Sequence, residues 1–248
     1  MPAVFVHGVP ETPAIWDALR SHLSRHDVTA LQLPGFGCPR PAGFGATKEE
    51  YVAWLVGELE PIAAQGPIDL VGHDWGGGFV LRLVSTRADL VRSWVTDIAG
   101  LGHADFVWHD VAKVWQTPGA GEEFFEQALA QTPEERGALY AAVFGVPLEA
   151  AVALNRRIDR TMADCILDLY RSAIDVALEW APDFHDIPAP GCVLLAAEDP
   201  LISADLARRA TARAGATLTE LGGVSHWWML QDPAAGAAAL EKFWATLG

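Results

Sequence analysis

An aspartate, a second acid and a histidine, each directly after a short apolar run, are the residues here that could do chemistry together. They are Asp74, Asp199 and His226, in that order along the chain. A carboxylate is ionised at neutral pH, so Asp74 needs no base before it attacks a saturated carbon. Histidine can then take a proton from water, and an acid can orient it. This chain order is typical of a hydrolytic triad.

The residues around Asp74 indicate a sharp turn between a strand and a helix. Residues 72–78 read Gly-His-Asp-Trp-Gly-Gly-Gly, so small residues stand on both sides of the acid. A turn of this kind pushes its central side chain outward, and glycines relieve the crowding that results. The start of the following helix favours the ionised form of Asp74.

The elements that must position these residues alternate between short apolar strands and helices. The strands are expected at residues 3–6, 28–33, 68–71, 94–98, 192–196 and 217–221. Helices are expected at residues 13–23, 48–62, 79–84, 204–214 and 234–247. Fully apolar strands separated by helices favour a parallel α/β sheet of about six strands, covered on both faces. The site is then expected at the carboxyl ends of the strands.

The chain resembles the α/β-hydrolase family, in the branch whose nucleophile is an aspartate. The matching segments are His7-Gly8-Val9-Pro10 with Trp16, the turn at residues 72–77, Glu198-Asp199-Pro200, and His226-Trp227 near residues 231–233. The resemblance implies an α/β-hydrolase core at residues 1–100 and 187–248, without the first two strands of the family. It also implies a helical cap at residues 101–186, where strand signals are few.

The resemblance assigns roles to particular residues. Asp74 is the nucleophile, His226 the base and Asp199 the acid, while the backbone N–H groups of Val9 and Trp75 hold an oxyanion. Asp97 also follows a strand and is an alternative acid, because some dehalogenases take the acid from that position. No metal or organic cofactor is expected.

Two reactions remain open for such a triad. In epoxide hydrolases, tyrosines of the cap donate to the opening oxygen, and Tyr170 in Leu-Tyr-Arg-Ser resembles one of them. A second tyrosine is missing where Trp108 and His109 stand, so His109 or Tyr140 is the alternative donor. The substrate-binding residues expected from the resemblance are His7, Pro10, Trp108, His109, Trp115, Tyr140 and Trp227.

The leading hypothesis is a hydrolase that opens a small apolar epoxide to a diol through an ester on Asp74. The alternative is a haloalkane or haloacid dehalogenase with the same triad, in which Trp75 and a tryptophan of the cap hold the halide. A further alternative is a protein that binds a ligand on this scaffold without hydrolysis. An ordinary esterase is disfavoured, because serine or cysteine normally stands at the position of Asp74.

Composition disfavours some classes of binding partner. The 248 residues carry a net charge of −15, which opposes binding to nucleic acid or to an anionic membrane. Mean hydropathy is +0.18, yet no apolar run is long enough to span a bilayer. The three cysteines are too scattered for a disulfide framework, and no signal segment is recognisable. We expect a cytoplasmic monomer or homodimer that acts on a small molecule.

Overall fold

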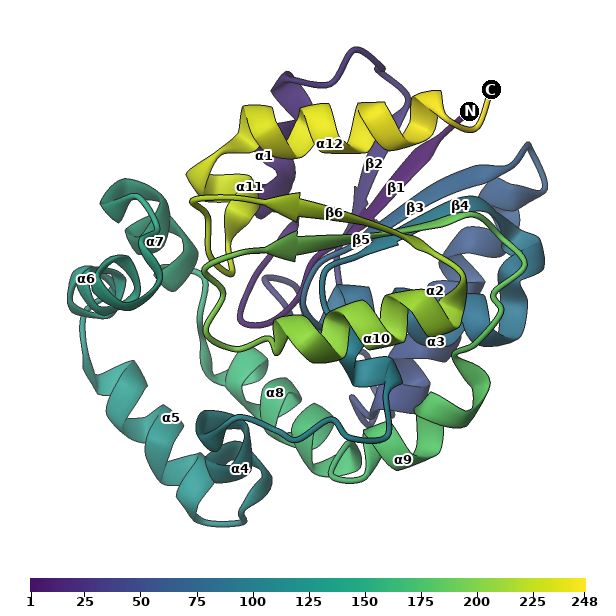
Figure 1. Cartoon of the computed structure of the whole chain (residues 1–248). Helices are drawn as coiled ribbons and strands as arrows, with labels where there is room; N and C mark the ends of the chain where they lie inside the picture. Colours follow the sequence, from purple (N-terminus) through teal and green to yellow (C-terminus); the bar gives the residue numbers. More distant parts are fainter.

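A central sheet of six strands, all parallel, organises the molecule (Figure 1). The computed structural model describes residues 1–248. The strands are β1 (Ala3–Val6), β2 (Val28–Leu31), β3 (Ile68–Gly72), β4 (Val91–Thr96), β5 (Gly191–Ala196) and β6 (Thr217–Leu221). Their order across the sheet is β2-β1-β3-β4-β5-β6. The predicted α/β fold with about six strands is therefore confirmed.

Helices cover both faces of this sheet (Figure 1). One face carries α1 (Asp17–Ser21), α11 (Trp228–Gln231) and α12 (Pro233–Ala245), and the other carries α2 (Lys48–Ala63), α3 (Trp75–Arg87) and α10 (Ala204–Ala214). Every residue of β1, β3 and β5 is consequently buried. Burial on both faces explains why these strands are mostly apolar rather than alternating, with Asp69 of β3 as the one charged residue among them.

Local sequence signals explain where the helices begin. Thr47 accepts a hydrogen bond from the backbone of Glu50, and the Glu50 carboxylate accepts one from the backbone of Thr47, so α2 begins with a capping box. The segment predicted as a helix at residues 13–23 is a short 3-10 turn, η1 (Pro13–Trp16), followed by α1. A further 3-10 turn, η2 (Ala88–Leu90), leads from α3 into β4. None of the helices combines the length and the apolarity needed to cross a membrane.

Between β4 and β5 the chain forms only helices. They are η3 (Ala99–Gly102), α4 (Asp110–Gln116), α5 (Ala120–Ala130), α6 (Pro133–Phe144), α7 (Leu148–Asn155), α8 (Arg160–Ser172), α9 (Val176–Trp180) and η4 (Ala181–Asp183). We call residues 101–186 the helical insertion. Helices α6 and α7 pack mainly against each other and form an antiparallel hairpin, which lies apart from α4 and α5 in Figure 1.

Candidate active site

Asp74 lies in a strained turn between β3 and α3. Its backbone has φ 48° and ψ −126°, a conformation that non-glycine residues seldom adopt. The turn is packed so closely against β1 that a Cβ atom on Gly76 would lie 2.3 Å from the carbonyl oxygen of Val6. Close packing of this kind holds the strained backbone in place and presents the carboxylate at the end of the sheet.

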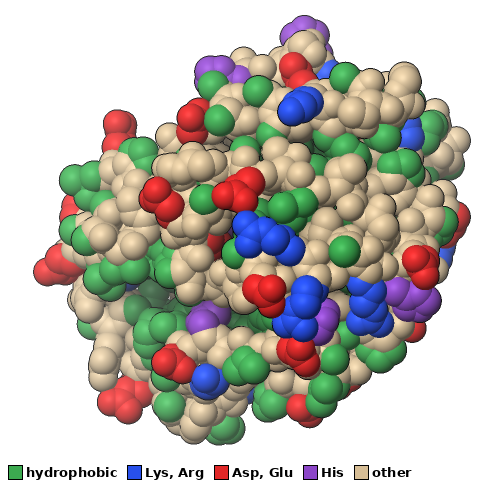
Figure 2. Space-filling model, in the orientation of Figure 1, with side chains coloured by type: hydrophobic (Ala, Val, Ile, Leu, Met, Phe, Trp, Pro, Cys, Tyr) green, Lys and Arg blue, Asp and Glu red, His purple; other side chains and the backbone are tan.

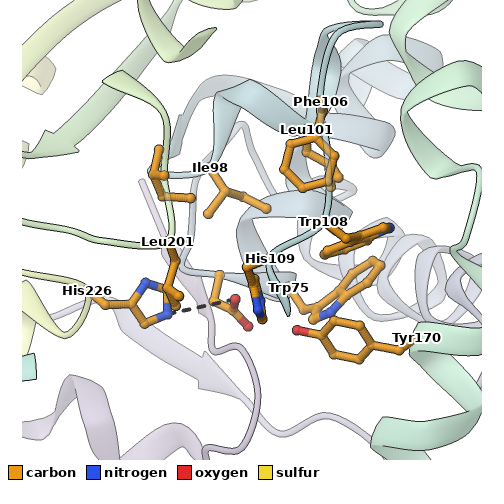
Figure 3. A pocket seen from close by; sticks show the side chains of 11 residues that line it. Trp75, Ile98, Leu101, Phe106, Trp108, His109, Tyr170, Leu201 and His226 are labelled. Atoms are coloured by element: carbon orange, nitrogen blue, oxygen red, sulfur yellow. Dashed lines mark ion pairs between the residues drawn. The ribbon is translucent and has the colours of Figure 1, made fainter. Parts of the chain in front are cut away.

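His226 stands beside Asp74 and is held by Asp199. The Nδ1 of His226 donates to the Oδ2 of Asp199 over 2.8 Å, and the other oxygen of Asp199 accepts from the backbone N–H of Leu201 over 2.8 Å. The proton on Nδ1 leaves Nε2 as the basic nitrogen of the neutral ring. Nε2 lies 3.8 Å from the Oδ2 of Asp74 (Figure 3), which is longer than a hydrogen bond.

One of the two predicted oxyanion donors contacts the carboxylate itself. The backbone N–H of Val9 donates to the Oδ1 of Asp74 over 2.8 Å. Trp75 is the first residue of α3, so its N–H has no acceptor within the helix. Val9 is therefore placed to stabilise negative charge that develops on the carboxyl group of residue 74, and the N–H of Trp75 is free to act as the second donor that the sequence predicts.

Burial shifts the titration of the reacting groups. It raises the pKa of Asp74 to about 6, although the neighbouring charge of His226 acts in the opposite direction. Burial alone would lower the pKa of His226, but Asp199 outweighs it and the pKa is raised, with a smaller contribution from Asp74. The pKa of each of these two groups thus depends on the charge of the other.

Asp97, the alternative acid, belongs to a second buried network. One of its oxygens accepts from the backbone N–H of Asp74 over 3.0 Å, and the other bonds to Nδ1 of His73 and to the indole N–H of Trp228. The Nε2 of His73 bonds to the carboxylate of Glu11 over 3.0 Å. The structure therefore pairs Asp199, and not Asp97, with His226.

The network of Glu11, His73 and Asp97 is charged, and it holds the backbone both at Gly8 and at Asp74. Burial opposes the charge of His73, but Glu11 and Asp97 outweigh it and raise the pKa of His73 well above its usual value. An imidazolium thus lies between two carboxylates. Glu11 also accepts from the backbone N–H of Gly8, next to Val9, while Asp97 holds the backbone of Asp74.

Neither Glu11 nor His73 was among the predicted site residues. Their signal in the sequence is only that each ionisable residue adjoins a motif residue, Pro10 in one case and Asp74 in the other. Donor atoms of Glu11, His73 and His226 lie within 4.8 Å of one another, which is a spacing that a metal ion could use. All three side chains already have hydrogen-bond partners, however, so we assign the cluster to hydrogen bonding.

A small pocket lies over Asp74 and His226. Its remaining lining is mostly apolar and comprises Trp75, Ile98, Leu101, Phe106, Trp108, His109, Tyr170, Leu201 and Ile202 (Figure 3). Its volume is about 30 Å³, which is room for about one or two water molecules. No lysine or arginine lines it. The pocket therefore suits a small neutral molecule and offers no counterion to an anionic one.

Two hydrogen-bond donors of the helical insertion face this pocket. The hydroxyl of Tyr170 points into it (Figure 3), and burial together with the charge of Asp74 raises the pKa of that phenol well above its usual value. The Nδ1 of His109 accepts from the backbone N–H of Ala112 over 3.1 Å, so the proton of the neutral ring is on Nε2. Burial lowers the pKa of His109, which keeps the ring neutral.

Of the residues predicted to bind substrate, Trp108 and His109 line the pocket and the other five do not. Trp115 packs against Tyr170, with ring centroids 4.8 Å apart. His7 is buried under the sheet end, where it accepts from the backbone of Leu33. Pro10 follows a cis peptide bond beside Val9 and is buried. Tyr140 and Trp227 pack on each other, with ring centroids 5.1 Å apart.

Comparison with known proteins decides the family. Residues 3–239 match the model of a family described as "Alpha/beta hydrolase family". The chain belongs to the α/β-hydrolase family. It is 25% identical to (E)-2-((N-methylformamido)methylene)succinate hydrolase of Acinetobacter baylyi over 217 residues, which is 83% of this chain and 75% of that protein. It is also 33% identical over 90 residues to lipase LipV of Mycobacterium tuberculosis, 36% of this chain and 34% of the lipase.

Solved structures of this family share the fold. The haloalkane dehalogenase DatA from Agrobacterium tumefaciens superposes with a TM-score of 0.78 at 19% identity, over 100% of this chain and 90% of that one. An E-2-(acetamidomethylene)succinate hydrolase superposes with a TM-score of 0.72 at 18% identity, over 98% and 91% of the two chains. At such identities the likeness speaks for the fold alone, so the reaction of this α/β hydrolase must be argued from its own site.

Proposed function

We propose that this α/β hydrolase opens a small neutral epoxide to a diol through an ester on Asp74. The observation that carries the proposal is a carboxylate at the strained turn, with a backbone N–H on one oxygen and a histidine–aspartate pair beside the other. Such a carboxylate attacks carbon directly, whereas ester and amide hydrolysis normally use a hydroxyl or a thiol at this position.

In the first step, the carboxylate of Asp74 forms a bond to a ring carbon of the epoxide while the bond between that carbon and the ring oxygen breaks. The ring oxygen takes the proton of the Tyr170 hydroxyl, whose raised pKa keeps it protonated until then. His109 offers a second N–H to the same oxygen, in place of the missing tyrosine. Solvent later returns a proton to Tyr170.

In the second step, His226 takes a proton from water, and the resulting hydroxide attacks the carboxyl carbon of Asp74. Esterification has removed the charge of Asp74, which is one of the groups that raise the pKa of His226, so the ring becomes more readily neutral. Val9 and Trp75 stabilise the oxyanion through their backbone N–H groups. The ester bond then breaks, and the diol leaves with the proton from His226.

The lining of the pocket supports a neutral substrate. A carboxylate-bearing substrate would enter an apolar pocket beside Asp74 with no lysine or arginine to pair with it. We therefore do not extend to this chain the succinate-type substrate that its relative's name states, nor the haloacid reading. We further propose that the helical insertion acts as a cap, because it supplies Tyr170, His109 and Trp108 to the pocket.

A haloalkane dehalogenase is the second candidate, and one observation favours it. The indole N–H of Trp75 is buried, belongs to a residue that lines the pocket and has no hydrogen-bond partner. Unpaired buried donors are costly, and a halide leaving group would satisfy this one. The same ester on Asp74 would form, with halide leaving instead of the ring oxygen.

Matched variants separate the two candidates. The protein is incubated with a panel of small epoxides and haloalkanes, and the products are identified. For an epoxide hydrolase, Tyr170→Phe lowers the ring-opening rate by about 10²-fold or more, while Trp75→Phe has a small effect. For a dehalogenase the two effects are reversed. Tyr51→Phe is the control, because Tyr51 is a buried phenol that donates to the carbonyl of Pro34 and does not line the pocket.

Ring opening by the wild type that is unaffected by Tyr170→Phe would overturn the role of that phenol. No turnover of any member of the panel would favour the ligand-binding alternative.

A further inference from the structure

One side-chain amide joins the loop that carries His226 to the α6–α7 hairpin. The Oε1 of Gln231 accepts from the backbone N–H of Ser225 over 2.7 Å, directly before His226. Its Nε2 donates to the carbonyl oxygens of Phe144 and Gly145, over 3.1 and 3.3 Å, at the end of α6. The partners fix the orientation of this amide, because an N–H can only donate and a carbonyl can only accept.

The hairpin rests on the histidine loop through two aromatic rings of α6. Phe144 packs against Trp227 and His226, with ring centroids 4.9 and 6.4 Å apart. Tyr140 packs against the other side of this contact, 5.1 Å from the ring of Trp227. His226 is only 3% exposed, and Phe144 of the hairpin covers it together with the core rings of His73 and Trp227. The hairpin thus covers the base, and Gln231 is its polar tie to the core at this point.

The rest of the hairpin exposes several large hydrophobic side chains to solvent. Leu139, Val143 and Leu148 are all more than half exposed. The molecular surface is hollowed between the hairpin and the rest of the helical insertion, and hydrophobic side chains border the hollow (Figure 2). The pocket over Asp74 has a volume of only about 30 Å³, so a substrate larger than a few atoms fits there only if part of its cover moves.

We propose that Gln231 is a positioning residue that couples closure of the α6–α7 hairpin to the placement of His226. When the hairpin is closed, the amide holds the backbone before His226 and the end of α6 at once. Opening the hairpin breaks the two donor contacts, removes Phe144 and Tyr140 from the histidine loop, and exposes His226 to solvent. The base is then in place only while the substrate is enclosed.

The substitution Gln231→Glu keeps the hydrogen bond to the histidine loop and removes those to the hairpin. A carboxylate still accepts from the backbone N–H of Ser225, but it has no proton for the carbonyls of Phe144 and Gly145 and is repelled by them. Gln65→Glu is the matched control. The exposed Gln65 also donates to a backbone carbonyl, that of Pro61, but it is distant in sequence from both the hairpin and His226. Both variants add the same charge.

Two measurements follow the coupling without any substrate. Hydrogen exchange of the amides in residues 133–155 reports opening of the hairpin, and carbethoxylation of His226 by diethyl pyrocarbonate reports its exposure. We expect Gln231→Glu to accelerate both by about tenfold, from the loss of two hydrogen bonds, with no change in the exchange of β3 or in carbethoxylation of the exposed His22. Gln65→Glu should behave as the wild type.

Faster hairpin exchange with unchanged modification of His226 would overturn the coupling, and so would no change in either. A third measurement depends on the proposed function: Gln231→Glu should slow hydrolysis of the ester on Asp74 more than its formation. If the wild type turns over no epoxide or haloalkane, the proposed function fails, while exchange and carbethoxylation still decide whether Gln231 couples the hairpin to His226.

Discussion

Replacing Asp199 by asparagine tests whether this acid sets the proton position on His226. One oxygen of Asp199 accepts from the backbone N–H of Leu201 and the other accepts from the Nδ1–H of His226, each over 2.8 Å. An asparagine has a single oxygen. If that oxygen keeps the N–H of Leu201, the NH₂ group faces Nδ1 and moves the imidazole proton to Nε2. The ring then has no free nitrogen toward the attacking water.

The size of the effect follows from the loss of the base. A histidine held in the wrong tautomer costs roughly 10⁴-fold in a hydrolytic step, or about 5.5 kcal/mol of barrier. Formation of the ester on Asp74 needs no base, so its rate should change little. Asp199→Asn should therefore accumulate the alkyl-enzyme, and mass spectrometry of the intact protein after one turnover should show the added mass of the substrate.

The control is Asp205→Asn, which removes an exposed carboxylate that pairs with Arg209 on α10. It should turn over as the wild type does and accumulate no adduct. Normal turnover by Asp199→Asn would show that Asp199 does not set the proton position on His226. An adduct that accumulates in Asp97→Asn instead would assign the acid to Asp97.

Two further predictions concern charge. Burial raises the pKa of Asp74 to about 6, and only the carboxylate anion is a nucleophile. The rate of ester formation should therefore fall as the pH drops through about 6. A rate that stays flat between about pH 5 and about pH 8 in single turnovers would contradict this. His73→Leu should lower the free energy of unfolding by about 3–5 kcal/mol, measured by urea titration, because it leaves Glu11 and Asp97 buried without a cation. The control is His22→Leu, at an exposed histidine. A loss below about 1 kcal/mol would show that His73 is not a buried cation between two carboxylates.

The inner strands β1, β3 and β5 could be predicted from the sequence because they are buried on both faces and are mostly short apolar runs. The largest difference is the start of β4, which is predicted at Trp94 and lies at Val91, while β2 and β4 each end two residues earlier than predicted, at Leu31 and Thr96. Arg92 and Ser93 interrupt the apolar pattern there, and both bond to the buried Asp69 of β3. A polar pair between neighbouring strands cannot be recognised until the strands are placed side by side.

The motif residues of the site could be predicted because each one follows a strand. Asp97 and Asp199 both do so, however, and only the direction of their side chains shows that Asp199 faces His226 while Asp97 faces His73. The contact of Gln231 with the end of α6 was equally hidden, since 86 residues separate it from Gly145. Sequence order indicates which residues reach the same end of the sheet, and side-chain packing decides which of them pair.

Transfer of heavy oxygen from water shows directly whether an ester forms on Asp74. The protein is allowed a single turnover with the best epoxide of the panel in heavy-oxygen water, and the peptide that contains Asp74 is then weighed, along with the diol. Water that attacks the carboxyl carbon leaves its oxygen on Asp74, so we predict label in the peptide and unlabelled diol from the first turnover. Label in the diol and none in Asp74 would mean that water attacks the substrate directly and that no ester forms on Asp74.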